Sequence, residues 1–376
     1  MAKSKPVISQ KTKERDKRTL EKIVALADDL SKKTFAGKEP TFHIPTRSKS
    51  NTIWNKKRGI LEMGDGKADR PLFDLKTAKQ FMQTVLHGST IKDLIEAGKT
   101  SSLRGVFYKA KHTVAGTKEN TFDTQEESDP ILEDLEVTLG ALREELHVFA
   151  ENRGVIAGNI TVIDGGDTID CRAAGRGGHG IPSIVEPDVF EFGKCEAKFV
   201  LHVEKGTVWN RFNEDRFWEK NNCILTHGAG QPPRGCRRLL QRLNQELKLP
   251  IICVLDCDPW GHYIYSVIKQ GSISLAFESS RLAIPDAKFL GLRAKDYEEC
   301  NLGDAVKIDL TENDIKRAKE IAAYPWFENH KGWQKEIQKL LSNGFKMEVE
   351  AMINKGISFV TEEYVPARLK AKDWLD

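Results

Sequence analysis

The sequence predicts a multidomain α/β protein, in which a mainly helical N-terminal part leads through a β-hairpin to a larger part built on a mostly parallel sheet. At 376 residues, the chain is too long to fold around a single hydrophobic core of ordinary size. Apolar residues follow a helical period through much of the first 150 residues. From residue 197 onward, apolar strands alternate with helical segments, which is the pattern of βαβ units.

The first 66 residues form a basic segment. They hold 16 Lys and Arg residues against 8 Asp and Glu residues, a charge of +8, whereas the whole chain carries +3 and the remainder therefore −5. A helix is expected over residues 14–32, where apolar residues recur at helical spacing: Leu20, Ile23, Val24, Ala27 and Leu30. A basic segment attracts a phosphate backbone, but a solvated arm or an amphipathic packing helix explains the charge equally well.

A sequence pattern typical of a helix-turn-helix motif follows the basic segment. Three short helices are expected at 74–87, 90–97 and 100–113, separated by the Gly88-Ser89 and Gly98-Lys99 breaks. A longer helix is expected at 128–150, and residues 155–163 and 167–171 then alternate apolar and polar side chains as in a β-hairpin. Helices followed by a hairpin predict a winged-helix module, in which the third helix commonly contacts DNA.

The second half of the chain reads as an open sheet with covering helices. The glycine-rich stretch Gly175–Gly180 marks either the domain boundary or a functional loop. Strands are expected at 198–204, 223–227 and 250–256, and helices at 206–219, 234–246, 311–322, 330–342 and 345–355, with an apolar stretch at 357–360. Ligands of such sheets bind at the carboxyl ends of the strands, so residues that end a strand are the first candidates for chemistry.

Composition places the protein in an intracellular, cytoplasmic setting. The seven cysteines are odd in number and contain no CxxC pair, which favours reduced core thiols over a disulfide framework. No apolar run approaches the ~20 residues that a bilayer requires, and the N-terminal stretch MAKSKPVISQ lacks the apolar core of a secretory signal.

Two aspartates follow a strongly apolar strand. Residues 250–255 (PIICVL) lead directly into Asp256 and Asp258, and in an extended chain residues two apart face the same way. Two such carboxylates repel each other unless a cation lies between them, and carboxylate oxygens suit Mg²⁺. A bare DxD is common by chance, and an acidic turn that caps the next helix is the alternative explanation.

A third carboxylate ends another strand. Residues 199–203 (FVLHV) lead into Glu204, which is followed by Lys205-Gly206. Adjacent parallel strands would bring Glu204, Asp256 and Asp258 to one edge of the sheet. The order and spacing of these acids over residues 197–300 resemble the Toprim domain of topoisomerases and related nucleases. That resemblance implies Mg²⁺ binding by the three acids, phosphodiester chemistry, and a further role for the glutamate in proton transfer.

The third predicted helix offers a nucleophile. Leu103, Val106, Phe107 and Ala110 form its apolar face, so Tyr108 lies on the flank. The same flank carries Arg104 and Lys111, cations that would attract a phosphate and favour a developing phenolate. A tyrosine at a packing seam with its hydroxyl in water is the alternative.

An Arg-x-x-Phe-Tyr helix placed before a Toprim glutamate and DxDPWG resembles the A-subunit family of topoisomerase VI, a type IIB topoisomerase. The meiotic double-strand-break transesterases share the core of that family. Further similar segments are IPxRSxxNxxW at residues 44–54, Arg58-Gly59 and the GxGQP turn at 228–232, so the resemblance spans most of residues 40–370. Gly105 departs from the family, whose members often carry an acidic residue there.

The resemblance implies a specific activity and assembly. Tyr108 would attack double-stranded DNA to form a 5′-phosphotyrosyl bond, Arg104 would orient the phosphate, and Lys111 would contact DNA. Mg²⁺ would be held by Glu204, Asp256 and Asp258. The chain contains no GxxxxGK[ST] loop, so ATP would be bound by a separate ATPase B subunit in an A2B2 heterotetramer around a homodimer of this chain.

Three regions follow from the combined pattern. They are a basic extension at 1–66 as the partner-subunit contact, a winged-helix (CAP-like) DNA-cleavage domain at 67–175, and a Toprim metal-binding domain with a helical C-terminal elaboration at 190–376.

Three other functions remain open on the residues alone. A meiotic-type transesterase that does not reseal DNA would share the catalytic residues, although the segment at 44–54 looks more like the topoisomerase branch. A DNA-binding or assembly protein with a decayed site conflicts with the intact Tyr108 and the three acids. A Toprim nuclease or primase would leave Tyr108 without a role.

Overall fold

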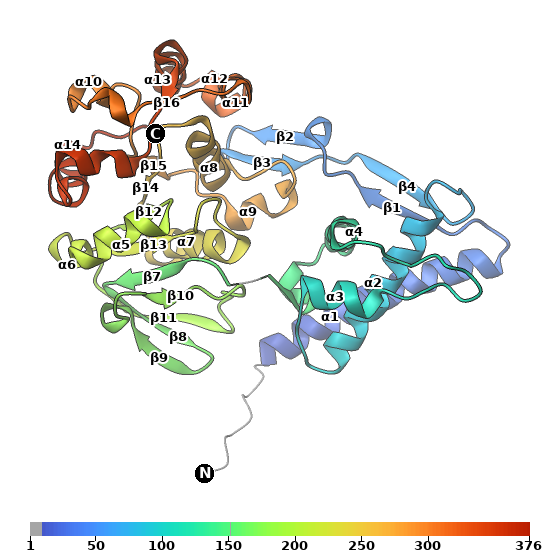
Figure 1. The fold of residues 1–376 in the computed structure, drawn as a ribbon. Coiled ribbons are helices and arrows are strands. Elements are labelled where there is room, and N and C mark those ends of the chain that lie inside the picture. Colours follow the sequence, from blue (N-terminus) through green and yellow to red (C-terminus); the bar gives the residue numbers. More distant parts are fainter. Residues whose placement is uncertain (1–9, 151) are drawn as a thin grey trace. The chain divides into compact units, whose positions relative to one another are not determined.

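The computed structural model describes residues 10–150 and 152–376, so the first nine residues of the expected basic extension lie outside it. The chain forms two compact units, each drawn in Figure 1. Unit 1 comprises residues 1–51 and 63–151, and unit 2 comprises residues 52–62 and 152–376. The expected boundary near Gly175 therefore differs from the observed one, which lies close to residue 151.

Unit 1 is mainly helical. Its helices are α1 (Gln10–Phe35), α2 (Ala78–Glu96), α3 (Leu103–Ala110) and α4 (Gln125–Leu139), followed by a 3-10 turn (Arg143–Leu146). Two short sheets join them: β1 (Thr41–Pro45) pairs with β4 (Lys67–Pro71) antiparallel, and β5 (Ser101–Ser102) pairs with β6 (Val148–Phe149) parallel. The helices share one apolar core with members from all four, among them Ile23, Ile91, Val106 and Leu132.

Helix α2 corrects the expected pair of helices at 74–87 and 90–97. Gly88 and Ser89 lie inside one continuous helix, because the buried face formed by Phe81, Thr84, Ile91 and Ile95 continues across them. A glycine within a helix costs about 1 kcal/mol, and packing of this face in the core of unit 1 outweighs that cost. The expected helix at 128–150 instead ends at Leu139, where Gly140 adopts a left-handed φ of 54°.

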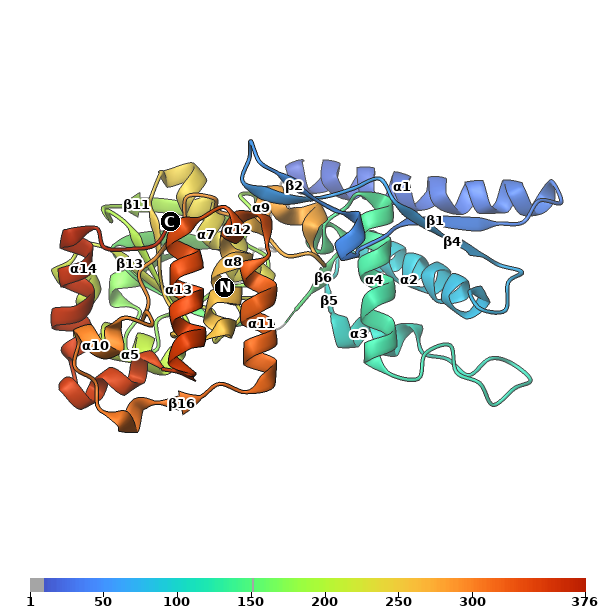
Figure 2. The same ribbon diagram turned by 90° about the horizontal axis from the view of Figure 1, so that it is seen from above.

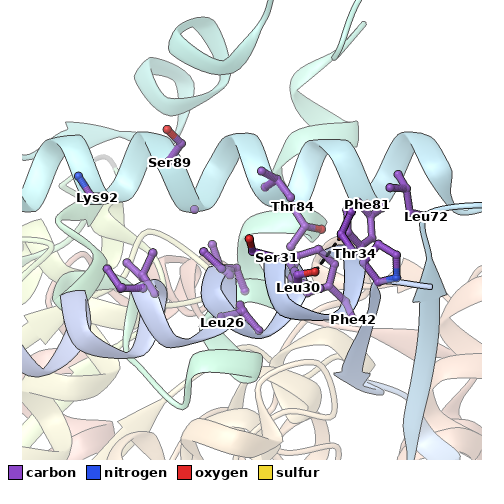
Figure 3. Close-up of a pocket in the computed structure, with 17 residues that line it drawn as sticks. Leu26, Leu30, Ser31, Thr34, Phe42, Leu72, Phe81, Thr84, Ser89 and Lys92 are labelled. Carbon is purple, nitrogen blue, oxygen red and sulfur yellow. Dashed lines mark hydrogen bonds between the residues drawn. The ribbon is translucent and has the colours of Figure 1, made fainter. Parts of the chain in front are cut away.

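Helix α1 confirms the predicted N-terminal helix and contacts α2. Figure 1 and Figure 2 show the two helices from two directions. Leu26 and Leu30 of α1, Phe42 of β1 and Phe81 and Thr84 of α2 line a cavity of about 380 Å³ (Figure 3). No carboxylate, imidazole or thiol lines this cavity among the residues that the structure describes, so the chemistry must be sought elsewhere.

Unit 2 is built on a six-stranded sheet in the order β10-β7-β13-β12-β14-β15. Its strands are β7 (Val155–Gly158), β10 (His179–Gly180), β12 (Val200–Val203), β13 (Ile224–His227), β14 (Ile251–Val254) and β15 (Lys288–Phe289). The four strands β13, β12, β14 and β15 are parallel, whereas β7 and β10 run antiparallel to their neighbours. The mostly parallel sheet predicted from the strand pattern is thus confirmed.

The predicted hairpin forms but belongs to unit 2. Strands β8 (Ile160–Asp164) and β9 (Asp167–Asp170) pair antiparallel, and β11 (Phe190–Cys195) completes a three-stranded sheet with them. It therefore cannot be the wing of the unit 1 helices. Gly175–Gly180 likewise lies within unit 2, where β10 pairs with β7. The side chain of Asn213 donates to the carbonyls of Gly175 and Arg176, which ties this loop to the helix after β12.

Helices cover the unit 2 sheet. They are α5 (Gly206–Glu214), α6 (Phe217–Lys220), α7 (Arg234–Leu247), α8 (Pro259–Gln270), α9 (Ser279–Leu282), α10 (Asp296–Glu299), α11 (Glu312–Ala322), α12 (Pro325–Glu328), α13 (Lys331–Asn343) and α14 (Val365–Ala371). The predicted helices at 311–322 and 330–342 are confirmed as α11 and α13, which pack together. The hairpin of β2 (Thr52–Asn55) and β3 (Ile60–Met63) also joins this unit through residues 52–62, and Trp54 packs edge-on against Trp326.

The helix expected at 345–355 is wrong. Residues Phe345–Lys346 form β17 against β16 (Ile308–Asp309), and Met347 pairs with Cys257 in an isolated bridge before a 3-10 segment at Val349–Lys355. Backbone pairing with the loop after β14 outweighs the local helical period.

The seven cysteines are unpaired, as predicted, and five of them are buried. None of the helices in the described part of the chain combines the length and the apolarity that crossing a membrane demands.

Candidate active site

The candidate nucleophile lies on helix α3 of unit 1. The Ser102 hydroxyl accepts a hydrogen bond from the Gly105 N–H at 3.0 Å and so caps the helix. Val106, Phe107 and Ala110 are buried, as the apolar period predicted, and Tyr108 is 58% exposed on the opposite flank. An exposed tyrosine on a short, capped helix is available to a macromolecular substrate.

A guanidinium adjoins the Tyr108 hydroxyl. The Arg104 Nη2 atom donates to Tyr108 Oη at 3.4 Å. This hydrogen bond and the positive charge of Arg104 lower the pKa of Tyr108 below its usual value. The sequence pattern that placed Arg104 one turn before Tyr108 thus corresponds to a direct contact.

Lys111 is less closely engaged with Tyr108 than the helical wheel suggested. Its Nζ atom donates to the Asp123 carbonyl at 3.0 Å and lies 5.3 Å from the centre of the Phe107 ring. Helix α3 ends at Ala110, so the backbone of Lys111 is already extended. Its charge adds only a small further lowering to the pKa of Tyr108.

A second hairpin, which the sequence reasoning missed, follows α3. Thr113 and Asn120 form an antiparallel bridge, and the Val114 N–H donates to the Glu119 carbonyl at 2.8 Å. Gly116 has a φ of +77°, which suits the turn. The dipeptide Gly116-Thr117 is the sequence feature that could have indicated this turn. The strands on either side of it are polar and lack the apolar alternation that predicts a hairpin.

Gly105 gives room to a neighbouring hydroxyl. A Cβ at this position would come within 2.3 Å of the Ser101 Oγ atom. A larger residue at position 105 would therefore require the Ser101 hydroxyl to move to another rotamer.

The three predicted acids gather at the carboxyl edge of the unit 2 sheet. Glu204 follows β12 and Asp256 follows β14, and these strands are neighbours in register. The Asp256 N–H donates to Glu204 Oε2 at 3.1 Å. Asp258 caps α8 by accepting a hydrogen bond from the Gly261 N–H, so the capping alternative raised by the sequence is also true of this residue.

Burial and the negative charges of neighbouring carboxylates disfavour the ionised forms of these acids. Burial, with a smaller contribution from the charge of nearby Asp256, raises the pKa of Glu204 to about 7. Burial also raises the pKa of Asp256 and of Asp258 above their usual values. A cation at this edge would offset both effects.

Lys205 supplies one such cation from the chain itself. Its Nζ atom lies 2.9 Å from Asp256 Oδ2, 2.9 Å from Glu348 Oε1 and 3.0 Å from Glu350 Oε2. Burial lowers its pKa, but the hydrogen bonds to Asp256, Glu348 and Glu350 outweigh this and raise it overall. Sequence reasoning missed Glu348 and Glu350, because nothing local links them to residues about 145 positions earlier.

The donor set fits a hard divalent cation held with water. Within the described residues, no three His, Cys, Asp or Glu side chains are arranged so that together they could hold a metal ion. Mg²⁺ does not need such a group of three, because it usually keeps several waters and takes one or two carboxylates. The carboxylate oxygens of Glu204, Asp256 and Asp258 are of the ligand type that Mg²⁺ prefers.

Comparison with known proteins identifies this arrangement. Residues 199–369 match the Toprim domain of the family that comprises Spo11 and the topoisomerase 6 A subunits, and residues 79–148 match a type IIB DNA topoisomerase domain. Residues 150–196 match an all-β domain of the DNA topoisomerase VI α subunit, which corresponds to the hairpin sheet of unit 2. The matched domains thus show that this is a type IIB DNA topoisomerase with a Toprim domain.

Whole-chain similarity makes the assignment more specific. The chain is 40% identical to the A subunit of type 2 DNA topoisomerase 6 from Pyrococcus abyssi, covering 96% of this chain and 97% of that protein. It is also 40% identical to its counterpart from Aeropyrum pernix, covering 90% and 91%, and 30% identical to the A subunit of DNA topoisomerase 6 from Arabidopsis thaliana, covering 92% and 79%. The chain belongs to the family of topoisomerase VI A subunits, the DNA-cleaving subunits of type IIB topoisomerases, as its motifs predicted.

Proposed function

We propose that Tyr108 is the DNA-cleaving nucleophile of this protein. The observation that carries the proposal is the exposed Tyr108 hydroxyl with the Arg104 guanidinium 3.4 Å away, on a helix whose other face is buried. A neighbouring cation favours the phenolate and attracts a phosphate, the two conditions that nucleophilic attack requires.

The proposed reaction is a reversible transesterification of DNA. The Tyr108 oxygen bonds to a phosphorus atom and loses its proton to solvent, the bond from phosphorus to the 3′ oxygen breaks, and that oxygen takes up a proton. The product is a 5′-phosphotyrosyl bond, which conserves the energy needed to reseal the strand by the reverse steps. Arg104 orients the phosphate and stabilises its charge, and Lys111 is placed to contact the DNA backbone.

Glu204, Asp256 and Asp258 are proposed to hold Mg²⁺. When bound, this ion supplies charge stabilisation at phosphate oxygens. Without a bound cation, burial raises the pKa of Glu204 to about 7, so that Glu204 is suited to hold or release a proton close to neutral pH, and binding of the cation would lower that pKa.

The helices of unit 1 are proposed to act as a winged-helix module. Support comes from α2, α3 and α4, with the hairpin at 112–121 directly after α3, the position where a wing follows a recognition helix. This hairpin replaces the one at 155–171 in that role.

The assembly is proposed to contain two copies of this chain and two ATPase B subunits acting on double-stranded DNA. The relatives' names designate subunits of a larger enzyme, and the chain lacks a phosphate-binding loop of its own. The basic extension at 1–66 is proposed as the contact with the B subunit.

Trapping the covalent intermediate tests the proposal. The chain is incubated with ATP, Mg²⁺ and supercoiled plasmid in the presence of an ATPase partner protein, and the reaction is stopped with denaturant. Wild type is expected to yield DNA bound covalently to protein, and Tyr108→Phe none. Tyr297→Phe is the matched control, because Tyr297 lies in unit 2 and donates to Asp304.

An adduct that persists in Tyr108→Phe would refute the nucleophile. Cleaved DNA without any adduct would instead favour a hydrolytic Toprim nuclease.

A further inference from the structure

Lys205 lies at the centre of a group of acidic side chains at the carboxyl edge of the unit 2 sheet. Its ammonium contacts Asp256, Glu348 and Glu350 at distances between 2.9 and 3.0 Å. Asp256 is one of the acids proposed to hold the metal, whereas Glu348 and Glu350 are half exposed and have no role in the mechanism above. The contact with Asp256 therefore competes with an incoming cation.

Both oxygens of the Asp256 carboxylate are already engaged. Oδ1 accepts a hydrogen bond from the Val349 N–H at 2.8 Å, and Oδ2 pairs with Lys205. The side chain is 4% exposed, so water does not easily provide a substitute partner. A divalent cation that binds Asp256 must therefore displace the ammonium from Oδ2 or share that oxygen with it.

The segment that carries Glu348 and Glu350 is fixed to the same loop. Cys257 and Met347 exchange two backbone hydrogen bonds, at 2.9 and 3.0 Å. Glu350 is held in addition by the hydroxyl of Thr207, in the first turn of α5. These two carboxylates thus remain beside Lys205 whether or not it contacts Asp256.

We propose that Lys205 is a built-in cation that neutralises Asp256 before the divalent metal arrives and is then retained by Glu348 and Glu350. The proposal rests on the metal site described under the proposed function. Lys205, Glu348 and Glu350 act through Asp256 and are positioning residues: Lys205 opposes metal binding, and the two glutamates favour it by drawing the ammonium away.

Binding of Mn²⁺ to the full chain, measured by calorimetry and by the electron paramagnetic resonance signal of free Mn²⁺, tests this without any DNA or activity. Lys205→Met is expected to tighten binding by about tenfold, because a like charge a few ångströms from the ion is removed. Lys205→Arg keeps the charge and is the matched control, with no such tightening expected. Circular dichroism confirms the fold of each variant.

The two glutamates are tested in two backgrounds. Glu350→Gln is expected to weaken Mn²⁺ binding severalfold in the wild-type background, because the ammonium then stays on Asp256. The same change is expected to have little effect in Lys205→Met, which has no ammonium to retain.

Three outcomes separate the possibilities. Unchanged or weaker Mn²⁺ binding by Lys205→Met would overturn the proposal. Equal weakening by Glu350→Gln in both backgrounds would also overturn it, because Glu350 would then act on the ion directly. If Glu204→Gln and Asp256→Asn leave Mn²⁺ binding unchanged, the proposed metal site itself is wrong.

Discussion

At the scale of single residues, the contact between Arg104 and Tyr108 ties the electrostatics of α3 to the proposed chemistry. Arg104 lowers the pKa of Tyr108, so its loss should return that pKa toward about 10, the ordinary value for tyrosine. Arg104→Gln is expected to slow adduct formation about 10²-fold at neutral pH, through the lost phosphate stabilisation and the weaker nucleophile. The rising limb of its pH–rate profile should move to higher pH.

Lys109→Gln is the control for this experiment, because Lys109 pairs with Asp93 and not with Tyr108. Its profile should match that of the wild type. A profile of Arg104→Gln that overlies the wild type would show that the contact has no part in the reaction.

Gly105 allows a test of local packing. Alanine in a helix is normally more stable than glycine by up to about 1 kcal/mol, but here its Cβ would meet the Ser101 hydroxyl. Gly105→Ala alone should therefore be neutral or destabilising in urea unfolding, whereas in the Ser101→Ala background the same change should stabilise. A stabilising Gly105→Ala in both backgrounds would contradict the packing argument.

The direction in which a side chain faces was predictable from the sequence where the local helical or extended period determines it. Tyr108 is on the exposed flank of α3, as the helical period predicted, and Glu204 and Asp256 follow the carboxyl ends of neighbouring strands. Asp258 lies beyond its strand and caps α8. The environment of Lys205 was not predictable. Two of its partners, Glu348 and Glu350, come from a segment about 145 residues later, and their approach depends on the backbone bridge between Cys257 and Met347.

At the scale of elements, helix α13 carries a buried acid whose ionisation opposes folding. Glu336 is 7% exposed, accepts a hydrogen bond from the Ala294 N–H at 2.6 Å, and has a pKa that burial raises to about 7. Between the unfolded pKa of about 4.3 and about 7 the folded state binds more protons, so stability falls as pH rises through this window.

Glu336→Gln removes this ionisation while keeping the carbonyl that accepts the hydrogen bond. The substitution should raise the free energy of unfolding by on the order of 1–3 kcal/mol at pH 8, and by much less at pH 5. Chemical denaturation at the two pH values measures the difference. An equal effect at both would show that the folded-state pKa of Glu336 is close to its ordinary value.

Helices and strands whose apolar residues recur at a regular spacing were predicted well. The positions where such elements end or continue were predicted poorly. The strands β12, β13 and β14 and the helices α7, α11 and α13 fall within a few residues of expectation. The predicted helix break at Gly88-Ser89 was wrong, because packing in unit 1 outweighs the local preference of glycine. The predicted helix at 345–355 was wrong, because backbone pairing with Cys257 outweighs the local helical pattern. These forces act through residues distant in sequence.

At the scale of the whole molecule, the chain provides the DNA-cleaving part of the enzyme, whereas the proposed ATP site belongs to a partner. The purified chain alone is expected to hydrolyse no ATP and to relax no supercoiled plasmid, and addition of an ATPase B subunit should restore both. Phosphate release and gel electrophoresis follow the two activities. ATP-dependent relaxation by the chain alone would contradict the division of labour.

The division into units shows what a linear reading of the sequence misses. Residues 52–62 belong to unit 2 although the segments on both sides belong to unit 1, and the hairpin β8–β9 joins unit 2. A change in composition along the chain marked neither feature. Domain membership here follows from long-range contacts such as that between Trp54 and Trp326.

Identifying the amino acid that carries the DNA tests the role of Tyr108 most directly. The trapped adduct is digested with nuclease and trypsin, and the nucleotide-bearing peptide is sequenced by mass spectrometry. Trypsin cuts after Arg104 and Lys109, so the nucleotide is expected on Tyr108 within the peptide of residues 105–109. A nucleotide on any other peptide would contradict it.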